Sequence, residues 1–305
     1  MSYSNIPKLQ FFQVTIPVEY VAHVEINRPQ KLNAFCDPMW PEMKAIFESL
    51  SSNPDVRCVL LSGAGDRAFS SGKILVLETG SYILSMATSL RIEVGLDVQA
   101  ASQQGPIQAR AIDPSRKAFA LRNHILDWQS CVSAISSCQK PVIALMHGYA
   151  YGAAIDLSTA CDIRFCASNT IFCVKETDIG LAADVGTLAR LPKVLGGLTS
   201  FAKEVALSAR PFSADEALKQ GFVSRVLSNK EELVAEGLKL AQLIASKSPV
   251  AVQGTKNVLD YAWGRTVEEN NNYVAVWNAG MLQSTDVERA MTSGLQKRKP
   301  TFEKL

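Results

Sequence analysis

The sequence KPVIALMHGYAYGAAIDLSTACDIRFCASNTIFCVKETDIGLAADVGTLARLP, residues 140–192, holds the signals that decide the fold. Its apolar runs at 141–146, 163–167 and 171–174 predict three short buried strands. Small residues at 148–154 let a ligand approach the backbone closely, and they lead into a helix predicted over 152–160, whose first N–H groups would be exposed. Strands and helices therefore alternate, and we predict an α/β fold.

Three carboxylates stand on this tightly turning apolar stretch. Asp156 falls just inside the predicted helix, Glu176 follows the third strand, and Asp184 lies where residues 180–186 are expected to open another helix. The stretch offers no His, Ser or Cys partner suited to a nucleophilic triad, so the carboxylates point to acid–base chemistry. Burial and mutual repulsion should raise the pKa of at least one of them. Alternatively, Asp156 and Asp184 only stabilise helix starts.

The rest of the chain extends the same pattern. Alternating residues predict paired strands at 11–17 and 21–27, and another buried strand is expected at 56–62. Amphipathic helices are predicted over 38–50 and 116–137, and helices end the chain at 250–260, 266–283 and 285–296. The patterns Ser213-x-x-Glu216 and Ser228-x-x-Glu231 mark two further helix starts. We predict an α/β core over 1–211 and a helical region over 212–305.

Composition excludes several classes of protein. The chain has 305 residues, 47% of them hydrophobic, and a net charge of +2, which is ordinary globular material and too weakly basic for nucleic-acid binding. Its seven Cys form no C-x-x-C pair and its three His are far apart, so we expect no metal site. Gly63-x-Gly65-x-x-Ala68 is a poor dinucleotide motif because a loop follows it. No run reaches the roughly 18 apolar residues of a membrane span.

A family resemblance is carried by Ile155-Asp156-Leu157, by residues 159–164, by Val174-Lys175-Glu176 and by GLAADVGT at 180–187. The chain resembles the enoyl-CoA hydratase/isomerase (crotonase) superfamily from about residue 21 to 286. It is most similar to the branch that isomerises 3,5-dienoyl-CoA to 2,4-dienoyl-CoA in fatty acid β-oxidation. The resemblance implies a crotonase-like spiral of strand–strand–helix units. It also implies a homohexamer, assembled from trimers through the C-terminal helices.

The resemblance also implies roles for individual residues, without metal or cofactor beyond the coenzyme A of the substrate. Glu176 would take a proton from carbon 2, Asp184 would deliver one to carbon 6, and Asp156 would tune them. The Ala153 N–H and the N–H after a Phe-x-x-Gly turn would bind the thioester oxygen. That second donor is Leu96 or, if the sequence is taken literally, Lys73; the turn residues concerned are Gly72, Gly95 and Asp97. Lys31 is a candidate phosphate contact, or simply a solvated turn lysine.

Residues 73–94 interrupt this turn. Removing Lys73–Val94 and merging Gly72 with Gly95 gives FSSGLDV, the join that the family leads us to expect. We interpret the stretch as a translated retained intron or gene-model error, since Gly-Lys and Val-Gly at its ends can encode splice signals. The alternative is a genuine surface insertion. Sequencing the transcript distinguishes the two.

Two rival functions and three locations stay open. A 2-enoyl-CoA hydratase would use Glu176 with another acid, although Asp rather than Glu at 156 and Asp184 in place of a Gly argue against it. An inactive scaffold or RNA-binding member of the superfamily is the other rival. The final Glu303-Lys304-Leu305 resembles the Ser-Lys-Leu peroxisomal address, or it is a frayed basic tail. We expect the peroxisome, with the mitochondrion or cytoplasm as alternatives, and the N-terminus lacks the pattern of a presequence.

Overall fold

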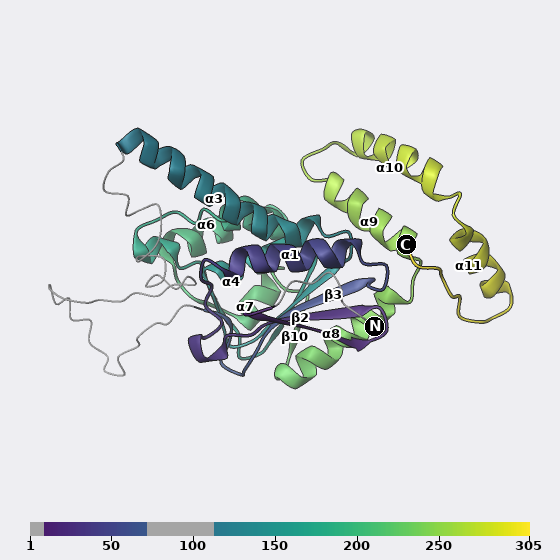
Figure 1. The fold of residues 1–305 in the computed structure, drawn as a ribbon, viewed down its shortest axis with the longest axis horizontal. Helices are drawn as coiled ribbons and strands as arrows, with labels where there is room; N and C mark the ends of the chain where they lie inside the picture. Colours follow the sequence, from purple (N-terminus) through teal and green to yellow (C-terminus); the bar gives the residue numbers. More distant parts are fainter. Residues whose placement is uncertain (1–8, 72–112) are drawn as a thin grey trace.

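The computed structural model describes residues 9–71 and 113–305 and contains two sheets (Figure 1). The larger sheet has six strands, in the spatial order β1 (Phe12–Val18), β2 (Val21–Ile26), β3 (Cys58–Gly63), β5 (Val142–Met146), β7 (Ile163–Ala167) and β10 (Arg225–Leu227). The β1–β2 pair is antiparallel and the other pairs are parallel. The predicted strand at 163–167 coincides with β7.

A second, four-stranded sheet lies beside the first. Its order is β4 (Ala68–Ser70), β6 (Tyr149–Tyr151), β8 (Ile171–Cys173) and β9 (Phe212–Ser213). The chain passes from β3 to β4, from β5 to β6 and from β7 to β8, so each turn adds one strand to each sheet. Helices follow these strand pairs. The predicted fold of repeated strand–strand–helix units is therefore confirmed.

Helices cover both faces of the larger sheet. The helices of the core are α1 (Met39–Ser52), α3 (Pro114–Ser137), α4 (Ala153–Ala160), α5 (Thr187–Val194), α6 (Thr199–Ser208), α7 (Ala214–Lys219) and α8 (Lys230–Ala245), with the 3₁₀ turns η1 (Pro29–Lys31) and η3 (Glu176–Ile179). In β3, Val59 and Leu61 enter one apolar cluster, whereas Cys58 and Leu60 enter a second cluster under α8. A sheet buried on both faces explains why its parallel strands read as continuous apolar runs.

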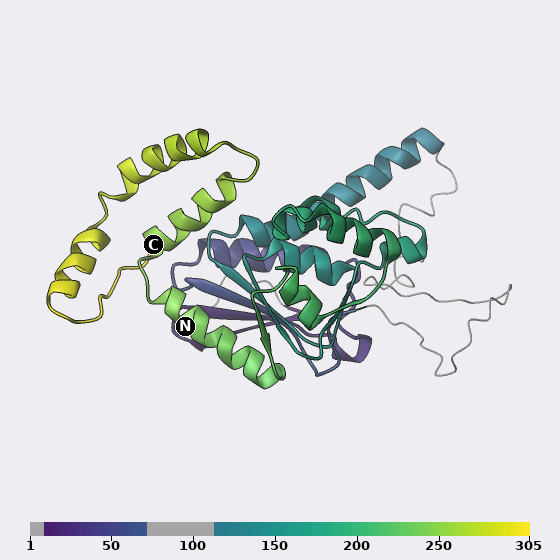
Figure 2. The ribbon, with the colours of Figure 1, turned by 180° about the vertical axis from the view of Figure 1, so that it is seen from behind.

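The last three helices, α9 (Pro249–Tyr261), α10 (Val267–Met281) and α11 (Thr285–Leu295), lie apart from the sheets in both views (Figures 1 and 2). Lys256 of α9 ties them to the core through Asp162, 2.8 Å away, and through the carbonyl of Lys140. The stretch predicted as helical, 212–305, also contributes β9, β10 and α8 to the core. None of the helices in residues 9–71 and 113–305 has the length and apolarity that a membrane crossing needs.

Two expected helix starts are wrong by a few residues. Residues 181–186 are irregular, and the helix expected there begins only at Thr187, since Gly180 and Gly186 have φ of 80° and 153°. In α8 the N-cap is Asn229, whose side chain accepts from the Glu232 N–H, so the cap and the helix start lie one residue later than the Ser228 cap predicted. The Ser213 cap is confirmed, because its hydroxyl accepts from the Glu216 N–H.

Candidate active site

The first residues of α4 form one wall of the site. Gly152 has φ 56° and ψ −115°, a conformation that side chains disfavour, and its N–H donates to the Cys173 carbonyl of β8 at 2.9 Å. Because Gly152 turns the chain sharply out of β6, α4 begins immediately at Ala153. The N–H groups of a helix's first turn have no acceptors within the helix. The Ala153 N–H is one of these donors, and such donors at a helix start favour negative charge; its predicted role at the thioester oxygen stays a prediction.

Asp156 stands in the first turn of α4, as the sequence predicted, and is 2% exposed. Its Oδ1 accepts two hydrogen bonds from Thr187, one from the backbone N–H at 2.6 Å and one from the hydroxyl at 2.8 Å. Burial raises the pKa of Asp156 to about 6, although the Thr187 donors and the Arg190 charge act in the opposite direction. The Thr187 donors thus hold Asp156 in one orientation, while burial keeps its pKa above the usual range.

Glu176 begins η3, the 3₁₀ turn that follows β8. Its Oε2 is buried and has no hydrogen-bond partner among residues 9–71 and 113–305. Burial, and then the charge of Asp156, raise the pKa of Glu176 to about 7. An unpartnered carboxylate oxygen with a near-neutral pKa has the properties of a general base.

Asp184 lies on the irregular segment 181–186, between η3 and α5. Its side chain is exposed, and partial desolvation raises its pKa, while its own backbone N–H and the charge of His124 oppose that rise. Asp184 also contributes to the raised pKa of both Glu176 and Asp156. The three predicted carboxylates therefore come together from α4, η3 and the 181–186 segment.

Sequence reasoning gave no role to two residues that support this cluster. Thr187 was quoted only as part of the 180–187 motif, yet it supplies both hydrogen bonds to Asp156. Arg190 lies over Gly186, and a Cβ added to Gly186 would meet the Arg190 guanidinium. The same guanidinium donates to the Ser133 hydroxyl of α3 at 2.9 Å. The signal available in the sequence was the Gly186-Thr187 pair at a helix start, since Gly leaves room for Arg190.

Lys31 lies elsewhere, at the end of η1. The neighbouring Leu32 carbonyl accepts from the Ser71 N–H at 2.9 Å, so the Lys31 turn packs against the strand β4 and the residue after it. Asn33 fixes this arrangement, because its amide donates to the carbonyls of Ala64 and Ala68. No contact between Lys31 and the carboxylates is seen in the described part of the chain.

The other predicted substrate-binding residues, Gly72, Gly95, Leu96 and Asp97, lie outside the described residues, as does the stretch 73–94. The second N–H donor for the thioester oxygen therefore stays a prediction. Within residues 9–71 and 113–305, no group of three or more His, Cys, Asp or Glu is arranged to hold a metal ion.

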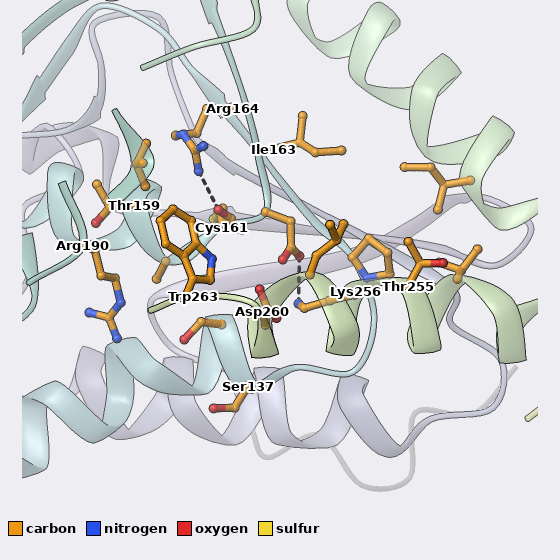
Figure 3. Close-up of a pocket in the computed structure, with 18 of the residues that line it drawn as sticks. Ser137, Thr159, Cys161, Ile163, Arg164, Arg190, Thr255, Lys256, Asp260 and Trp263 are labelled. Atoms are coloured by element: carbon orange, nitrogen blue, oxygen red, sulfur yellow. Dashed lines mark hydrogen bonds and ion pairs between the residues drawn. The ribbon is translucent and has the colours of Figure 1, made fainter. Parts of the chain in front are cut away.

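A cavity of about 1160 Å³ lies between the end of α4 and α9 (Figure 3). Its lining includes the Lys256–Asp162 ion pair and Arg164, whose guanidinium donates to the Cys161 carbonyl. Arg190 and Thr159 border it, but none of the three carboxylates does. We therefore place the chemistry at the carboxylate cluster and not in this cavity.

Comparisons with known proteins identify the family of the chain. The sequence profile of a family described as Enoyl-CoA hydratase/isomerase matches residues 18–92 and 115–304. The human mitochondrial Delta(3,5)-Delta(2,4)-dienoyl-CoA isomerase is 43% identical over 296 residues, which cover 96% of this chain and 82% of that protein. The peroxisomal Delta(3,5)-Delta(2,4)-dienoyl-CoA isomerase of Arabidopsis thaliana is 39% identical over 285 residues, covering 93% of both chains.

Solved structures share the fold. The crystal structure of an enoyl-CoA hydratase from Bacillus anthracis superimposes with a TM-score of 0.80 and covers 96% of this chain and 99% of its own. Its sequence identity is 22%, so the likeness concerns the fold alone.

Proposed function

The chain belongs to the enoyl-CoA hydratase/isomerase family, and from that premise we propose that it isomerises 3,5-dienoyl-CoA to 2,4-dienoyl-CoA. The human and Arabidopsis relatives carry that activity in their names. The observation that carries the proposal is the cluster of Asp156, Glu176 and Asp184, since moving two conjugated double bonds requires proton transfer at two distant carbons.

In the first step Glu176 removes a proton from carbon 2 of the acyl chain. The electron pair of that C–H bond delocalises toward the thioester oxygen and along the diene. The Ala153 N–H stabilises the resulting charge on the oxygen, together with a second donor that we assign to Leu96 or Lys73. One such donor typically changes the rate by roughly 10²–10³.

In the second step Asp184 delivers a proton to carbon 6. The electron pair of the C5–C6 double bond forms the new C–H bond, and the double bonds settle between carbons 2 and 3 and between carbons 4 and 5. No atoms are gained or lost overall, because one proton leaves carbon 2 and one arrives at carbon 6. The product is conjugated with the thioester carbonyl, which favours the forward direction.

The test is an isomerase assay with 3,5-octadienoyl-CoA, following the ultraviolet absorbance of the conjugated product. We expect turnover by the intact chain or by a variant that lacks Lys73–Val94 and keeps one glycine. If neither isomerises the substrate, the proposed function is wrong. We expect the shortened variant to be the more stable and active, because it restores the FSSGLDV turn; the opposite result would make 73–94 native structure.

The same preparation discriminates the rival functions. A hydratase would add water to crotonyl-CoA, and we expect that rate to be far below the isomerisation rate because Asp156 is already engaged by Thr187. A scaffold would be stabilised thermally by coenzyme A esters without turning them over. We further propose that no metal or added cofactor takes part, so dialysis against EDTA should leave the isomerisation rate unchanged.

We propose that the protein assembles into a homohexamer through its last three helices. Many of their large apolar side chains are exposed, including Leu259, Val267, Val276, Met291 and Leu295. Where exposed apolar side chains form a contiguous patch, that patch is characteristic of an interface. Light scattering after size-exclusion chromatography should give six times the chain mass, and Val276→Asp should lower it. A wild-type monomer would contradict the proposal.

We propose the peroxisome as the location. The support is the tail at 303–305, whose last residue, Leu305, is exposed, and the peroxisomal name of the Arabidopsis relative. A fusion with a fluorescent protein at the N-terminus should be found in peroxisomes. The same fusion without residues 303–305 should no longer be found there. Mitochondrial or cytoplasmic fluorescence from the intact chain would contradict this location.

A further inference from the structure

The backbone that carries Asp184 lacks regular structure of its own. Residues 181–186 form neither helix nor strand, and they link η3 to α5. The Leu181 N–H, at the start of the segment, donates to the Glu176 carbonyl at 3.2 Å. The Asp184 side chain is exposed, so packing around it contributes little to its position. A carboxyl group that must meet a substrate carbon in this setting needs support from outside the segment.

That support comes from α3. The Gln129 side-chain amide donates to the backbone carbonyl of Asp184 at 2.6 Å, so α3 contacts the very residue proposed to protonate carbon 6. Gln129 is separated from Asp184 by 55 positions in the sequence, which makes this a tertiary contact rather than a local turn.

A second bond reaches the end of the segment one helical turn further along α3. Ser133 lies four residues after Gln129, and residues at that spacing share one face of a helix. Its hydroxyl accepts from the Arg190 guanidinium at 2.9 Å. Arg190 in turn lies against Gly186, the last residue of the segment. One face of α3 therefore holds the segment at its middle and at its end.

We propose that Gln129 and Ser133 are positioning residues that hold Asp184 in place for proton delivery to carbon 6. This inference rests on the proposed isomerase function. A small misplacement of a reacting group costs up to about 10²-fold in rate, so support of this kind would act on turnover more than on binding. Proton removal at carbon 2 should be independent of it, because Glu176 is held by η3.

The test replaces Gln129 with Leu and with Glu, neither of which donates a hydrogen bond at that position. We expect kcat for 3,5-octadienoyl-CoA to fall by roughly 10- to 100-fold with a near-constant KM. Deuterium from solvent should still enter carbon 2 of unreacted substrate at the wild-type rate. Ser133→Ala should lower kcat by a smaller factor. Asn123→Leu and Ser136→Ala, which make matching changes on the same helix, should leave kcat unchanged.

The outcomes separate this inference from the proposed function. If the wild-type protein does not isomerise the substrate, the function fails and the inference with it. If the wild type is active and Gln129→Leu keeps its kcat, only the positioning role is wrong. If Gln129→Leu lowers both kcat and the rate of deuterium exchange at carbon 2, α3 supports the whole site. That result also contradicts a role in positioning Asp184. Thermal unfolding of each variant shows whether the fold is retained.

Discussion

The two proposed ends of the reaction are built in opposite ways. At the carbon-2 end, Glu176 and Asp156 are enclosed by short regular elements, and Asp156 is only 2% exposed. At the carbon-6 end, Asp184 is exposed on an irregular segment that α3 holds through Gln129. Burial raises the pKa of Glu176 to about 7, and the Asp156 charge adds to that rise; desolvation also raises the pKa of Asp184, but there the His124 charge opposes the rise.

This difference matches what each end has to do. The hydrogens beside a thioester are weakly acidic, so the base that removes one benefits from a pKa near the working pH. Glu176 gains that pKa chiefly from burial, and the described residues offer its Oε2 no hydrogen-bond partner. Asp184 acts on a carbon whose position depends on the rest of the acyl chain, and an exposed segment can be adjusted without disturbing the core.

Apart from replacing the carboxylates themselves, the largest effect is expected from Gly152→Ala. An L side chain is strained at φ 56° and ψ −115°, so the backbone should shift and turn the Ala153 N–H away from the thioester oxygen. We expect kcat to fall by on the order of 10²–10³, measured by isomerase assay. Gly221→Ala is the control, since Gly221 also has a positive φ, 74°, in open space far along the chain. Equal losses in both variants would mean general destabilisation.

The pH dependence of the free energy of unfolding should distinguish the two ends. The pKa of Glu176 rises from 4.5 to about 7 on folding, so folding is favoured by this group below pH 4.5 and loses that contribution as the pH rises to 7. Above pH 7 the buried carboxylate is ionised at a cost. Glu176→Gln should therefore increase the free energy of unfolding in urea by about 1–3 kcal/mol at pH 8, and by much less at pH 5.

Asp184→Asn is the matched comparison for that measurement. Because its side chain is exposed, we expect the free energy of unfolding to change by less than about 0.5 kcal/mol at either pH. A stabilisation at pH 8 as large as that of Glu176→Gln would mean that the two ends are equally buried.

A smaller effect is expected from Thr187→Val, which removes the hydroxyl donor and keeps the backbone donor to Asp156. Without the hydroxyl, the pKa of Asp156 should rise, so that Asp156 carries less negative charge at a given pH. The reduced charge would then raise the pKa of Glu176 less. In the plot of kcat/KM against pH, the acidic limb, where Glu176 becomes protonated, should move to lower pH by a few tenths of a pH unit. Thr187→Ser keeps the hydroxyl and should retain the wild-type profile. A shift to higher pH would contradict the proposed coupling.

The sequence predicted local features well and tertiary support poorly. The runs around β5 and β7 gave the buried strands, and Asp156 falls in the first turn of α4 as expected. Thr187 and Gln129 were given no role, because their partners lie 31 and 55 positions away and depend on how the helices pack. The helix expected within 180–186 begins late because both flanking glycines have positive φ, a property that residue types alone do not reveal.

The exact ends of helices and strands were also difficult to predict from the sequence. Ser228 and Asn229 are both good N-cap residues, and only the geometry shows that Asn229 caps α8. The short strand β6 falls in a run that we interpreted as a small-residue turn, because three residues pairing with β4 and β8 leave no periodic pattern. The family motif, by contrast, pointed to all three carboxylates, and their electrostatic influence on one another shows that they lie near one another, while their catalytic roles stay a prediction.

The most direct test of the division between the two ends is solvent deuterium at carbon 2 of unreacted 3,5-octadienoyl-CoA. Glu176→Gln and Asp184→Asn should each lower isomerisation by roughly 10²–10⁴, since each loses one proton transfer. Asp184→Asn should still place deuterium on carbon 2, because Glu176 remains, whereas Glu176→Gln should not. Equal exchange in the two variants, or wild-type turnover by Asp184→Asn, would contradict the assignment of Glu176 and Asp184 to opposite ends of the diene.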